Sequence, residues 1–278
     1  MENQQPPSYP PATWRLILDR EAGGATNMAV DEAILIAMLE GASPPTLRFY
    51  AWSPPCLSLG RNQPLADADL AACRAAGVDV VRRPTGGRAI LHTDELTYSL
   101  TLLQVDPRAT GDVVEGYRRL SEGLLAGLRL LEVEAVQAVG RKSATDAGPV
   151  CFEAPSNYEI TVAGRKLIGS AQWRSKGSVL QHGSLPLQGD LARIVDCLAL
   201  SDAQREVQRP HIRGRAITLE EAKGRIVPFA QVAEVLAEGF AQALNLTLLP
   251  GELSAHERAL AAELRRSRYA APGWTTRT

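Results

Sequence analysis

The sequence is poor in cysteine, and its few cysteines do not have the spacing of a metal site or a disulfide framework. Only four occur in 278 residues: Cys56, Cys73, Cys151 and Cys197. No two of them form a C-x-x-C pair, and none belongs to a Cys/His cluster, so neither a zinc site nor a disulfide-bonded scaffold is expected. Free thiols in a reducing compartment are predicted instead.

Excess charge and long apolar runs are also missing. The 30 Lys and Arg residues nearly balance 31 Asp and Glu residues, for a net charge of −1, which disfavours a general nucleic-acid binder. The longest dense apolar stretch, residues 33–39, is far shorter than the roughly 20 residues that span a bilayer. The proline-rich N-terminus has no feature of a secretion signal. We therefore expect a cytoplasmic protein with neither a nucleic-acid nor a membrane partner.

Two common catalytic motifs are lacking as well. No nucleophile elbow accompanies a Ser-His-Asp arrangement, and no phosphate-binding loop ends in GK[ST]. What remains is a globular composition, 45% hydrophobic and 22% charged. We predict a disordered leader at residues 1–13, one α+β domain at residues 14–250 and a helical C-terminal extension at residues 251–278.

Hydrophobic periodicity and punctuation residues predict the elements of this domain. Helices are expected at 26–40 with Thr26 as N-cap, at 67–76, at 112–132, at 229–245 and from Ser254 to about Arg268. Strands are expected at 14–18, 46–51, 78–82, 95–103 and 179–187, with a hairpin at 157–163 and 165–173. Alternating leucines in residues 95–103 indicate a half-buried strand.

The first unusual block is RRPTGGRAILH, residues 82–92. Adjacent Gly86 and Gly87 permit positive φ and bring backbone N–H groups close to a ligand, while three arginines and a histidine surround the turn. This pattern suits an anionic or acyl-carbonyl ligand. An ordinary Gly-Gly hairpin with a solvated basic rim is the alternative.

The second block contains Cys151 in a stretch rich in glycine and proline, which is typical of a loop. Lys166 follows 15 positions later on the predicted hairpin. A cation close to a thiol lowers its pKa by roughly one to three units, which would produce a thiolate at neutral pH. The alternative is that Cys151 is a small buried hydrophobic residue.

A third block, QHGS at residues 181–184, places His182 beside Gly183 at a strand position. A structural role, in which His182 bonds a neighbouring strand, is favoured. His211 and His256 are predicted to lie on the surface.

Taken in order, these blocks, together with CFEAPSNYEI, GRKLIGSAQWR and YAAPGWT, resemble the lipoate-protein ligase and octanoyltransferase family, which is related to the catalytic domain of biotin-protein ligases. The resemblance runs from about Trp14 to Trp274. It implies an α+β fold with a mixed β-sheet flanked by helices, and a pocket under the Gly-Gly loop that holds a medium-chain acyl group.

Within that family, Arg88 stands where ATP-dependent ligases have a third glycine, so the chain is most similar to the cysteine-containing octanoyltransferases of the ligase A-like branch. The resemblance implies that Cys151 is the acyl-thioester nucleophile and that Lys166 lowers its pKa. The residues that it places at the substrate are Arg83, Thr85, Gly86, Gly87, Arg88, His92, Gly169, Ser170, Ala171, His182 and Gly183.

The implied reaction moves an octanoyl group from octanoyl-acyl carrier protein, through a cysteine thioester, to a lysine of a lipoyl-domain protein such as the glycine cleavage H protein. It needs no cofactor and no metal, and a monomer is expected. Basic clusters at Arg82, Arg83 and Arg88, or at Arg174 and Lys176, are predicted to dock the acidic carrier. The alternatives are octanoyl transfer between lipoyl domains, ATP-dependent lipoate ligation, and a non-enzymatic module that binds an acyl or biotinyl group.

Overall fold

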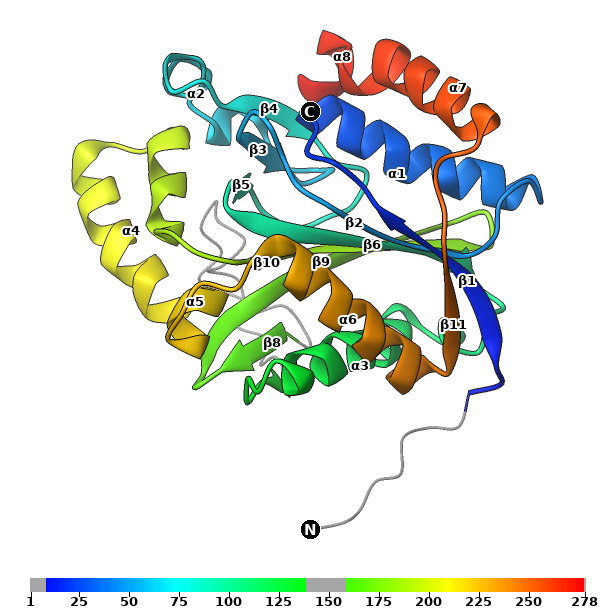
Figure 1. The fold of residues 1–278 in the computed structure, drawn as a ribbon. Coiled ribbons are helices and arrows are strands. Elements are labelled where there is room, and N and C mark those ends of the chain that lie inside the picture. Colours follow the sequence, from blue (N-terminus) through cyan, green and yellow to red (C-terminus); the bar gives the residue numbers. More distant parts are fainter. Residues whose placement is uncertain (1–8, 139–158, 278) are drawn as a thin grey trace.

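A computed structural model describes residues 9–138 and 159–277. Its main feature is an eight-stranded mixed sheet with the order β11-β1-β2-β6-β10-β9-β8-β7 (Figure 1). Strand β1 is parallel to both β2 and β11, and the other neighbours are antiparallel. The strands are β1 Ala12–Leu18, β2 Thr46–Tyr50, β6 Glu95–Leu103, β7 Val136–Ala138, β8 Glu159–Val162, β9 Arg165–Ser175, β10 Ser178–Pro186 and β11 Leu246–Pro250.

A second, three-stranded sheet lies beside the first. Its order is β4-β3-β5, with bounds β3 Cys56–Leu59, β4 Asp79–Arg82 and β5 Ile90–His92. Strand β3 is parallel to β4 and antiparallel to β5. Because β4 and β5 both pair with β3, residues 83–89 connect two strands that do not neighbour each other. The Gly-Gly segment is therefore no hairpin turn.

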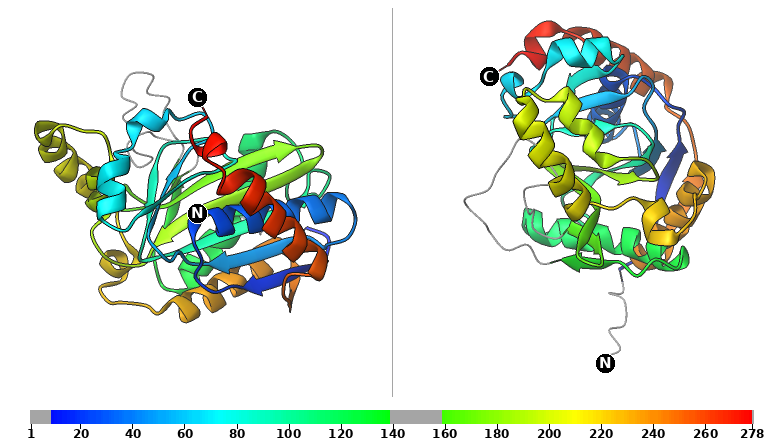
Figure 2. Two further views of the ribbon diagram at one scale, coloured as in Figure 1. Left: turned by 90° about the horizontal axis from the view of Figure 1, so that it is seen from above. Right: turned by 90° about the vertical axis from the view of Figure 1, so that its left-hand side faces the viewer.

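Helices cover both faces of the large sheet (Figures 1 and 2). Helix α1 packs against α7 over one face, and α3 packs against α6 over the other. The α-helices are α1 Gly24–Leu39, α2 Leu70–Ala75, α3 Val113–Leu130, α4 Asp202–Arg215, α5 Leu219–Lys223, α6 Phe229–Leu244, α7 Ala255–Leu264 and α8 Pro272–Thr275, with 3₁₀ turns η1 Leu65–Asp67 and η2 Leu191–Cys197 and a π-helical turn η3 Arg265–Tyr269.

Most predicted helix ends are confirmed by their caps. Asp112 forms a capping box at the start of α3, Ser254 forms one at α7, and Asn245 ends α6 in the left-handed region with φ of 51°. The start of α1 is corrected, because Gly23 is the N-cap and Thr26 lies within the first turn. Helix α2 begins at Leu70 rather than at 67, since the Asp69 side chain accepts from the next amides.

The prediction of a half-buried strand at residues 95–103 is wrong. Leucines of β6 face the core beneath α3 and α6, as predicted. The alternate residues Thr97, Ser99 and Thr101 are also buried, with 3% exposure or less. Helix α1 packs on β6, and Trp52 donates to Thr97 at 2.7 Å, so both faces of the strand are covered. Short hydroxyl side chains that alternate with leucine indicate a solvent face only when nothing packs over them.

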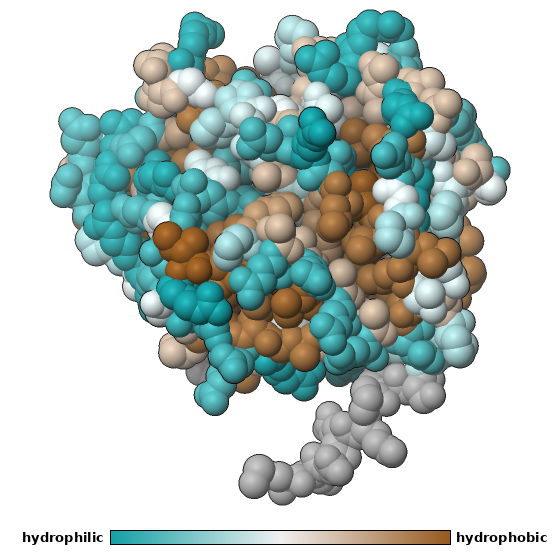
Figure 3. Space-filling model, viewed as in Figure 1, coloured by the Kyte–Doolittle hydropathy of each residue, from teal (hydrophilic) through white to brown (hydrophobic). Residues whose placement is uncertain are grey.

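Helix α4 was not among the predicted elements. Ile212 is the buried residue of this helix, and hydrophilic side chains cover the region in the space-filling view (Figure 3). Ion pairs hold it to η2, with Arg209 bonded to Asp196 and Arg213 bonded to Asp190, both at 2.6 Å. Because so few of its side chains are apolar, the helix lacks the continuous apolar stripe by which a helical period is recognised in a sequence.

The N-terminal end of the described residues packs on the domain. Tyr9 is buried, and its carbonyl accepts from Asn245 Nδ2 at 2.7 Å. Within the predicted leader, Tyr9 is therefore packed and residues 12–13 belong to β1, whereas residues 1–8 lie outside the described residues. No helix in the described ranges is both long and apolar enough to cross a membrane.

Candidate active site

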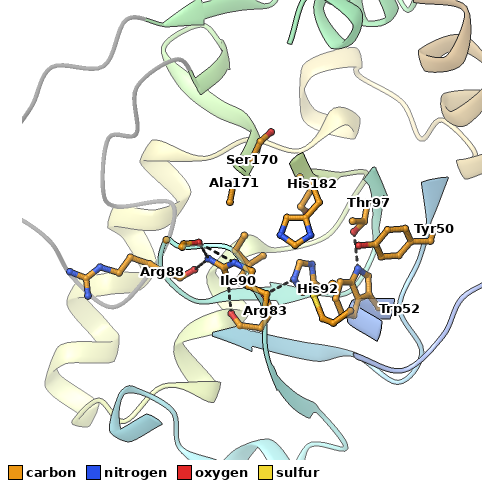
Figure 4. Close-up of a pocket in the computed structure, with 17 residues that line it drawn as sticks. Tyr50, Trp52, Arg83, Arg88, Ile90, His92, Thr97, Ser170, Ala171 and His182 are labelled. Atoms are coloured by element: carbon orange, nitrogen blue, oxygen red, sulfur yellow. Dashed lines mark hydrogen bonds between the residues drawn. The ribbon is translucent and has the colours of Figure 1, made fainter. Parts of the chain in front are cut away.

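A cavity lies between the two sheets (Figure 4), and Met28 of α1 also lines it. Its empty space is about 660 Å³ including the open mouth. In Figure 4, Arg88 extends away at one end, and Tyr50 and Trp52 lie at the opposite end. The lining residues come from both sheets and α1: Met28, Tyr50, Trp52, Ser58, Arg83, Gly86, Gly87, Arg88, Ile90, His92, Thr97, Gly169, Ser170, Ala171, His182, Gly183 and Ser184.

The structure brings the predicted substrate residues together around this cavity. All of them except Thr85 line it, and Thr85 lies directly behind, with its Oγ1 2.7 Å from His182 Nε2. Sequence reasoning missed the side chains at the end opposite Arg88. A signal exists only for Thr97 and Ser184, which continue the polar alternation on β6 and β10; Tyr50 and Trp52 have none.

Glycine is required at Gly87 and at the facing Gly60, each for a physical reason. Gly87 has φ of +97°, a conformation that side-chain-bearing residues rarely adopt. A Cβ on the facing Gly60 would lie 1.9 Å from the carbonyl oxygen of Gly87, so the two backbones pack directly against each other. From the other side, Arg83 Nη2 donates to the carbonyls of Gly86 at 2.8 Å and Arg88 at 2.7 Å. The loop is thus held between Gly60 on one side and the buried Arg83 on the other.

One polar network fixes the His92 ring in the cavity wall. His92 Nδ1 lies 2.7 Å from Glu95 Oε1, and Nε2 lies 2.8 Å from Ser58 Oγ. Trp52 stacks on the ring at 4.0 Å between centroids. Glu95 also accepts from Thr97 and from Ser184, each at 2.5 Å. With these polar groups bonded to one another, the wall presents ring and methyl surfaces that suit an apolar chain.

A second network surrounds Asp31 of α1, which is fully buried. Its carboxylate accepts from Arg48 and Tyr50 at 2.9 Å and from Ser99 at 2.8 Å, and lies 3.4 Å from His182 Nδ1. Burial by itself raises the pKa of Asp31, but the His182 hydrogen bond and the Arg48 charge outweigh it, and the net pKa is lowered. Burial lowers the pKa of His182 although Asp31 opposes it. We therefore expect an ionised Asp31 and a neutral His182 at neutral pH.

The structure corrects the prediction that Arg82 and Arg83 belong to a basic docking cluster. Arg82 and Arg83 have 0% and 3% exposure, and their guanidinium groups bond backbone carbonyls, those of Gly60 and Gly86 among them. Arg174 likewise donates to main-chain oxygens. A buried guanidinium enclosed by carbonyls cannot attract an acidic partner across solvent, so Arg82 and Arg83 serve the fold.

Lys166 lies in β9 with 3% exposure, and its Nζ is 2.7 Å from Glu159 Oε1. A Cβ built on Gly169 would lie 2.9 Å from Lys166 Cε and 3.3 Å from Nζ. Since Gly169 lines the cavity, the ammonium group lies just behind the cavity wall. Cys151 lies outside the described residues, so its pairing with Lys166 stays a prediction.

The other three cysteines are buried and free, and none lines the cavity. Burial raises the pKa of Cys56 well above its ordinary value, which makes that thiol a poor nucleophile. In residues 9–138 and 159–277, no three His, Cys, Asp or Glu side chains gather as a metal site would require.

Comparison with known sequences gives a consistent set of relatives. The model of the lipoyl protein ligase A/B catalytic domain matches residues 24–241. Octanoyltransferase LipM of Kyrpidia tusciae is 45% identical over 272 residues, covering 95% of this chain and 99% of that protein. Octanoyltransferase LipM of Moorella thermoacetica is 44% identical over 277 residues, covering 96% and 99%.

Solved structures share the architecture. A bipartite lipoate-protein ligase from Thermoplasma acidophilum has a TM-score of 0.80 at 23% identity, covering 95% of this chain and 96% of that one. A lipoate-protein ligase A crystallised with ATP has a TM-score of 0.79 at 23% identity, covering 95% and 98%. The predicted α+β fold, a mixed sheet flanked by helices, is confirmed.

Proposed function

The chain belongs to the lipoyl protein ligase A/B catalytic-domain family, and we propose that it is an octanoyltransferase of lipoate assembly that uses a Cys151 thioester. The donor is octanoyl-acyl carrier protein and the acceptor is a lysine of a lipoyl-domain protein such as the glycine cleavage H protein. The octanoyltransferase names of relatives that align over nearly the whole chain support the acyl group. The observation that carries the proposal is the cavity between the sheets, which has aromatic and aliphatic surfaces inside and the Lys166 ammonium behind its wall.

In the first half-reaction the Cys151 thiolate attacks the thioester carbonyl of the donor. A new C–S bond forms to Cys151, the original C–S bond breaks, and the phosphopantetheine thiolate leaves and takes up a proton. The octanoyl chain occupies the cavity, and backbone N–H groups near Gly169–Ser170 or Gly86–Gly87 are candidates to stabilise the oxyanion. The positive charge of Lys166 favours the thiolate form of Cys151.

In the second half-reaction the neutral amine of the acceptor lysine attacks the octanoyl thioester. The C–N bond forms, the C–S bond to Cys151 breaks, and the amine proton returns to the sulfur or to solvent. The product is an octanoyl amide, and the enzyme regains its free thiol. Because the donor is already an activated thioester, no step consumes ATP.

Intact-mass spectrometry tests the proposal directly. Purified protein mixed with octanoyl-acyl carrier protein, without nucleotide or acceptor, is expected to gain one octanoyl group that neutral hydroxylamine removes. Cys151→Ala is expected to abolish this adduct, whereas Cys197→Ala, which changes a buried cysteine that does not line the cavity, should retain it. An adduct of undiminished yield on Cys151→Ala would overturn the assignment of the nucleophile.

The same assay separates the remaining alternatives. A ligase would modify the acceptor from free octanoate only with ATP and magnesium, and an amidotransferase would take octanoyl from an octanoylated lipoyl domain but not from the carrier protein. A regulatory module would bind the acyl group without a covalent adduct. The transferase predicts an adduct from the carrier-bound donor alone.

A further inference from the structure

The C-terminal motif YAAPGWT, residues 269–275, contributes no lining residue to the cavity but contacts the strand that leads into the Gly-Gly loop. Trp274 Nε1 donates to the carbonyl of Arg82 at 2.8 Å, and Arg82 Nη2 donates back to the carbonyl of Thr275 at 2.9 Å. This reciprocal pair joins α8 to β4 at a fully buried arginine. The end of the chain is thereby bonded to the residue that directly precedes Arg83.

The other side of the Arg82 guanidinium holds the turn at residues 60–63. Its Nη1 donates to the carbonyls of Gly60 at 2.8 Å and of Gln63 at 2.6 Å. A planar fork of donors can bond the turn on one side and Thr275 on the other at the same time. A lysine ammonium carries its three donors on one nitrogen, so it does not span both sides as the guanidinium fork does. Arg82 is therefore the element that links the C-terminal segment to this turn.

The turn at residues 60–63 also supports the Gly86–Gly87 loop over the cavity. The Arg61 amide donates to the carbonyl of Thr85 at 2.8 Å. The missing Cβ of Gly60 leaves just enough space for the carbonyl of Gly87, since a Cβ there would lie 1.9 Å from it. Any displacement of the turn thus moves Gly87, which lines the cavity.

The C-terminal segment itself is firmly anchored. The Tyr269 hydroxyl donates to Glu32 of α1 at 2.6 Å. The Trp274 ring meets Tyr269 edge to face at 5.9 Å between centroids, and the Arg268 guanidinium lies 3.9 Å from the centroid of Trp274. Because its ring is held from two sides, the indole N–H is aimed at Arg82 at little entropic cost.

From this continuous set of contacts we infer that Trp274 and Arg82 are positioning residues, which fix the Gly86–Gly87 loop over the acyl group and so set the affinity for the acyl donor. The inference rests on the proposed octanoyl transfer. It assigns to the C-terminal extension a role in substrate binding that is separate from its packing on α1.

The test compares two variants that each lose one hydrogen bond of the same segment. Trp274→Phe keeps a ring against Arg268 and Tyr269 but removes the N–H that reaches Arg82. Tyr269→Phe keeps its ring and removes the hydroxyl bond to Glu32, so it is the matched control. Single-turnover acylation is followed over a range of octanoyl-acyl carrier protein concentrations, and thermal unfolding is recorded for each variant.

Trp274→Phe is expected to raise the half-saturating donor concentration roughly fivefold, with a maximal acylation rate within about twofold of the wild type. Tyr269→Phe is expected to lower the unfolding temperature but to leave half-saturation unchanged. Arg82→Lys should raise half-saturation like Trp274→Phe, and the double variant should be no worse than the more affected single variant, since both act in one chain of contacts.

Equal half-saturation in Trp274→Phe and the wild type would overturn the inference, as would strictly additive effects with Arg82→Lys. The wild-type reaction separates this from failure of the proposed function. If the wild type forms no octanoyl adduct, the octanoyltransferase assignment fails. If the wild type forms it and the variants saturate identically, only the positioning role fails.

Discussion

The buried His182 makes the stability of this protein depend on pH in a direction that can be tested. Four groups face the imidazole: Asp31 from α1, Thr85 and Arg83 from the β4–β5 segment, and His92 from β5. Burial lowers the pKa of His182, the neighbouring Arg83 and His92 lower it further, and Asp31 opposes them, with a net lowering. The unfolded chain therefore binds a proton at His182 more readily than the folded chain does.

The sign follows from linkage between protonation and folding. In the unfolded chain a histidine titrates near pH 6.5, and stability falls with decreasing pH wherever the unfolded state holds more protons. Below about pH 6.5, each further pH unit lowers the free energy of unfolding by up to about 1.4 kcal/mol through this one group. The loss ends where the pH reaches the pKa of His182 in the folded protein. Between pH 7.5 and pH 5.5 the loss through His182 is therefore at most about 1.4 kcal/mol.

Urea unfolding of the wild type and of His182→Gln at pH 7.5, 6.5 and 5.5 measures this loss. Glutamine retains polar atoms toward Thr85 and Asp31, so we expect a cost of roughly 1 to 2 kcal/mol at pH 7.5. The difference in unfolding free energy between wild type and variant should then narrow at pH 5.5, by at most about 1.4 kcal/mol. His211→Gln, at an exposed position of α4, is the control. Its difference in unfolding free energy from the wild type should not change between pH 7.5 and pH 5.5. A gap that widens on acidification would show that Asp31 outweighs burial and would refute the reasoning.

Three further predictions concern single side chains. Gly183→Ala should destabilise the fold by about 1 to 3 kcal/mol and slow octanoyl loading roughly tenfold or more, because its Cβ would lie 2.5 Å from Ser170 Oγ. Urea unfolding measures the loss of stability, and intact-mass spectrometry measures the loading rate. Burial by itself raises the pKa of Glu257, but the Arg15 hydrogen bond and its neighbours outweigh it and lower that pKa to about 2. Roughly 3 kcal/mol of stability present above about pH 4.5 is therefore lost as the pH falls toward 2, and acid unfolding of Glu257→Gln should lack this loss. Lys166→Ala should shift iodoacetamide labelling of Cys151 to higher pH, because in the proposed mechanism the Lys166 charge stabilises the thiolate.

Matched variants control these three measurements. Gly214→Ala adds the same methyl group in α4, where nothing lies within 4 Å, and should keep full loading. Glu263→Gln changes an exposed carboxylate and should leave the acid-unfolding curve unchanged. Arg165→Ala removes the neighbouring cation, which pairs with Glu221, and an equal labelling shift in this variant would argue against a specific role for Lys166.

Local signals in the sequence determined the elements that depend on neighbours a few residues away. Asp112, Ser254 and Asn245 mark helix ends because their caps are formed by groups within the same turn. The hairpin at Ala163–Gly164 follows from two adjacent residues with positive φ. The glycine-rich blocks likewise identified most residues of the cavity wall, since two backbones approach closely only at glycine, which is recognisable in the sequence.

Only the tertiary structure decided which surfaces meet. The hydroxyl side chains of β6 have the pattern of a solvent face, but α1 and Trp52 cover them, and the cavity lies between the two sheets. Arg82 and Arg83 look like a surface cluster in the sequence, yet both are buried because carbonyls far apart along the chain converge on their guanidinium groups. Asp31, Tyr50 and Trp52 carried no local sign of a site, since their partners are other buried side chains. A sequence specifies contacts within a turn or a strand pair directly, whereas the burial of a charge depends on the packing of whole layers.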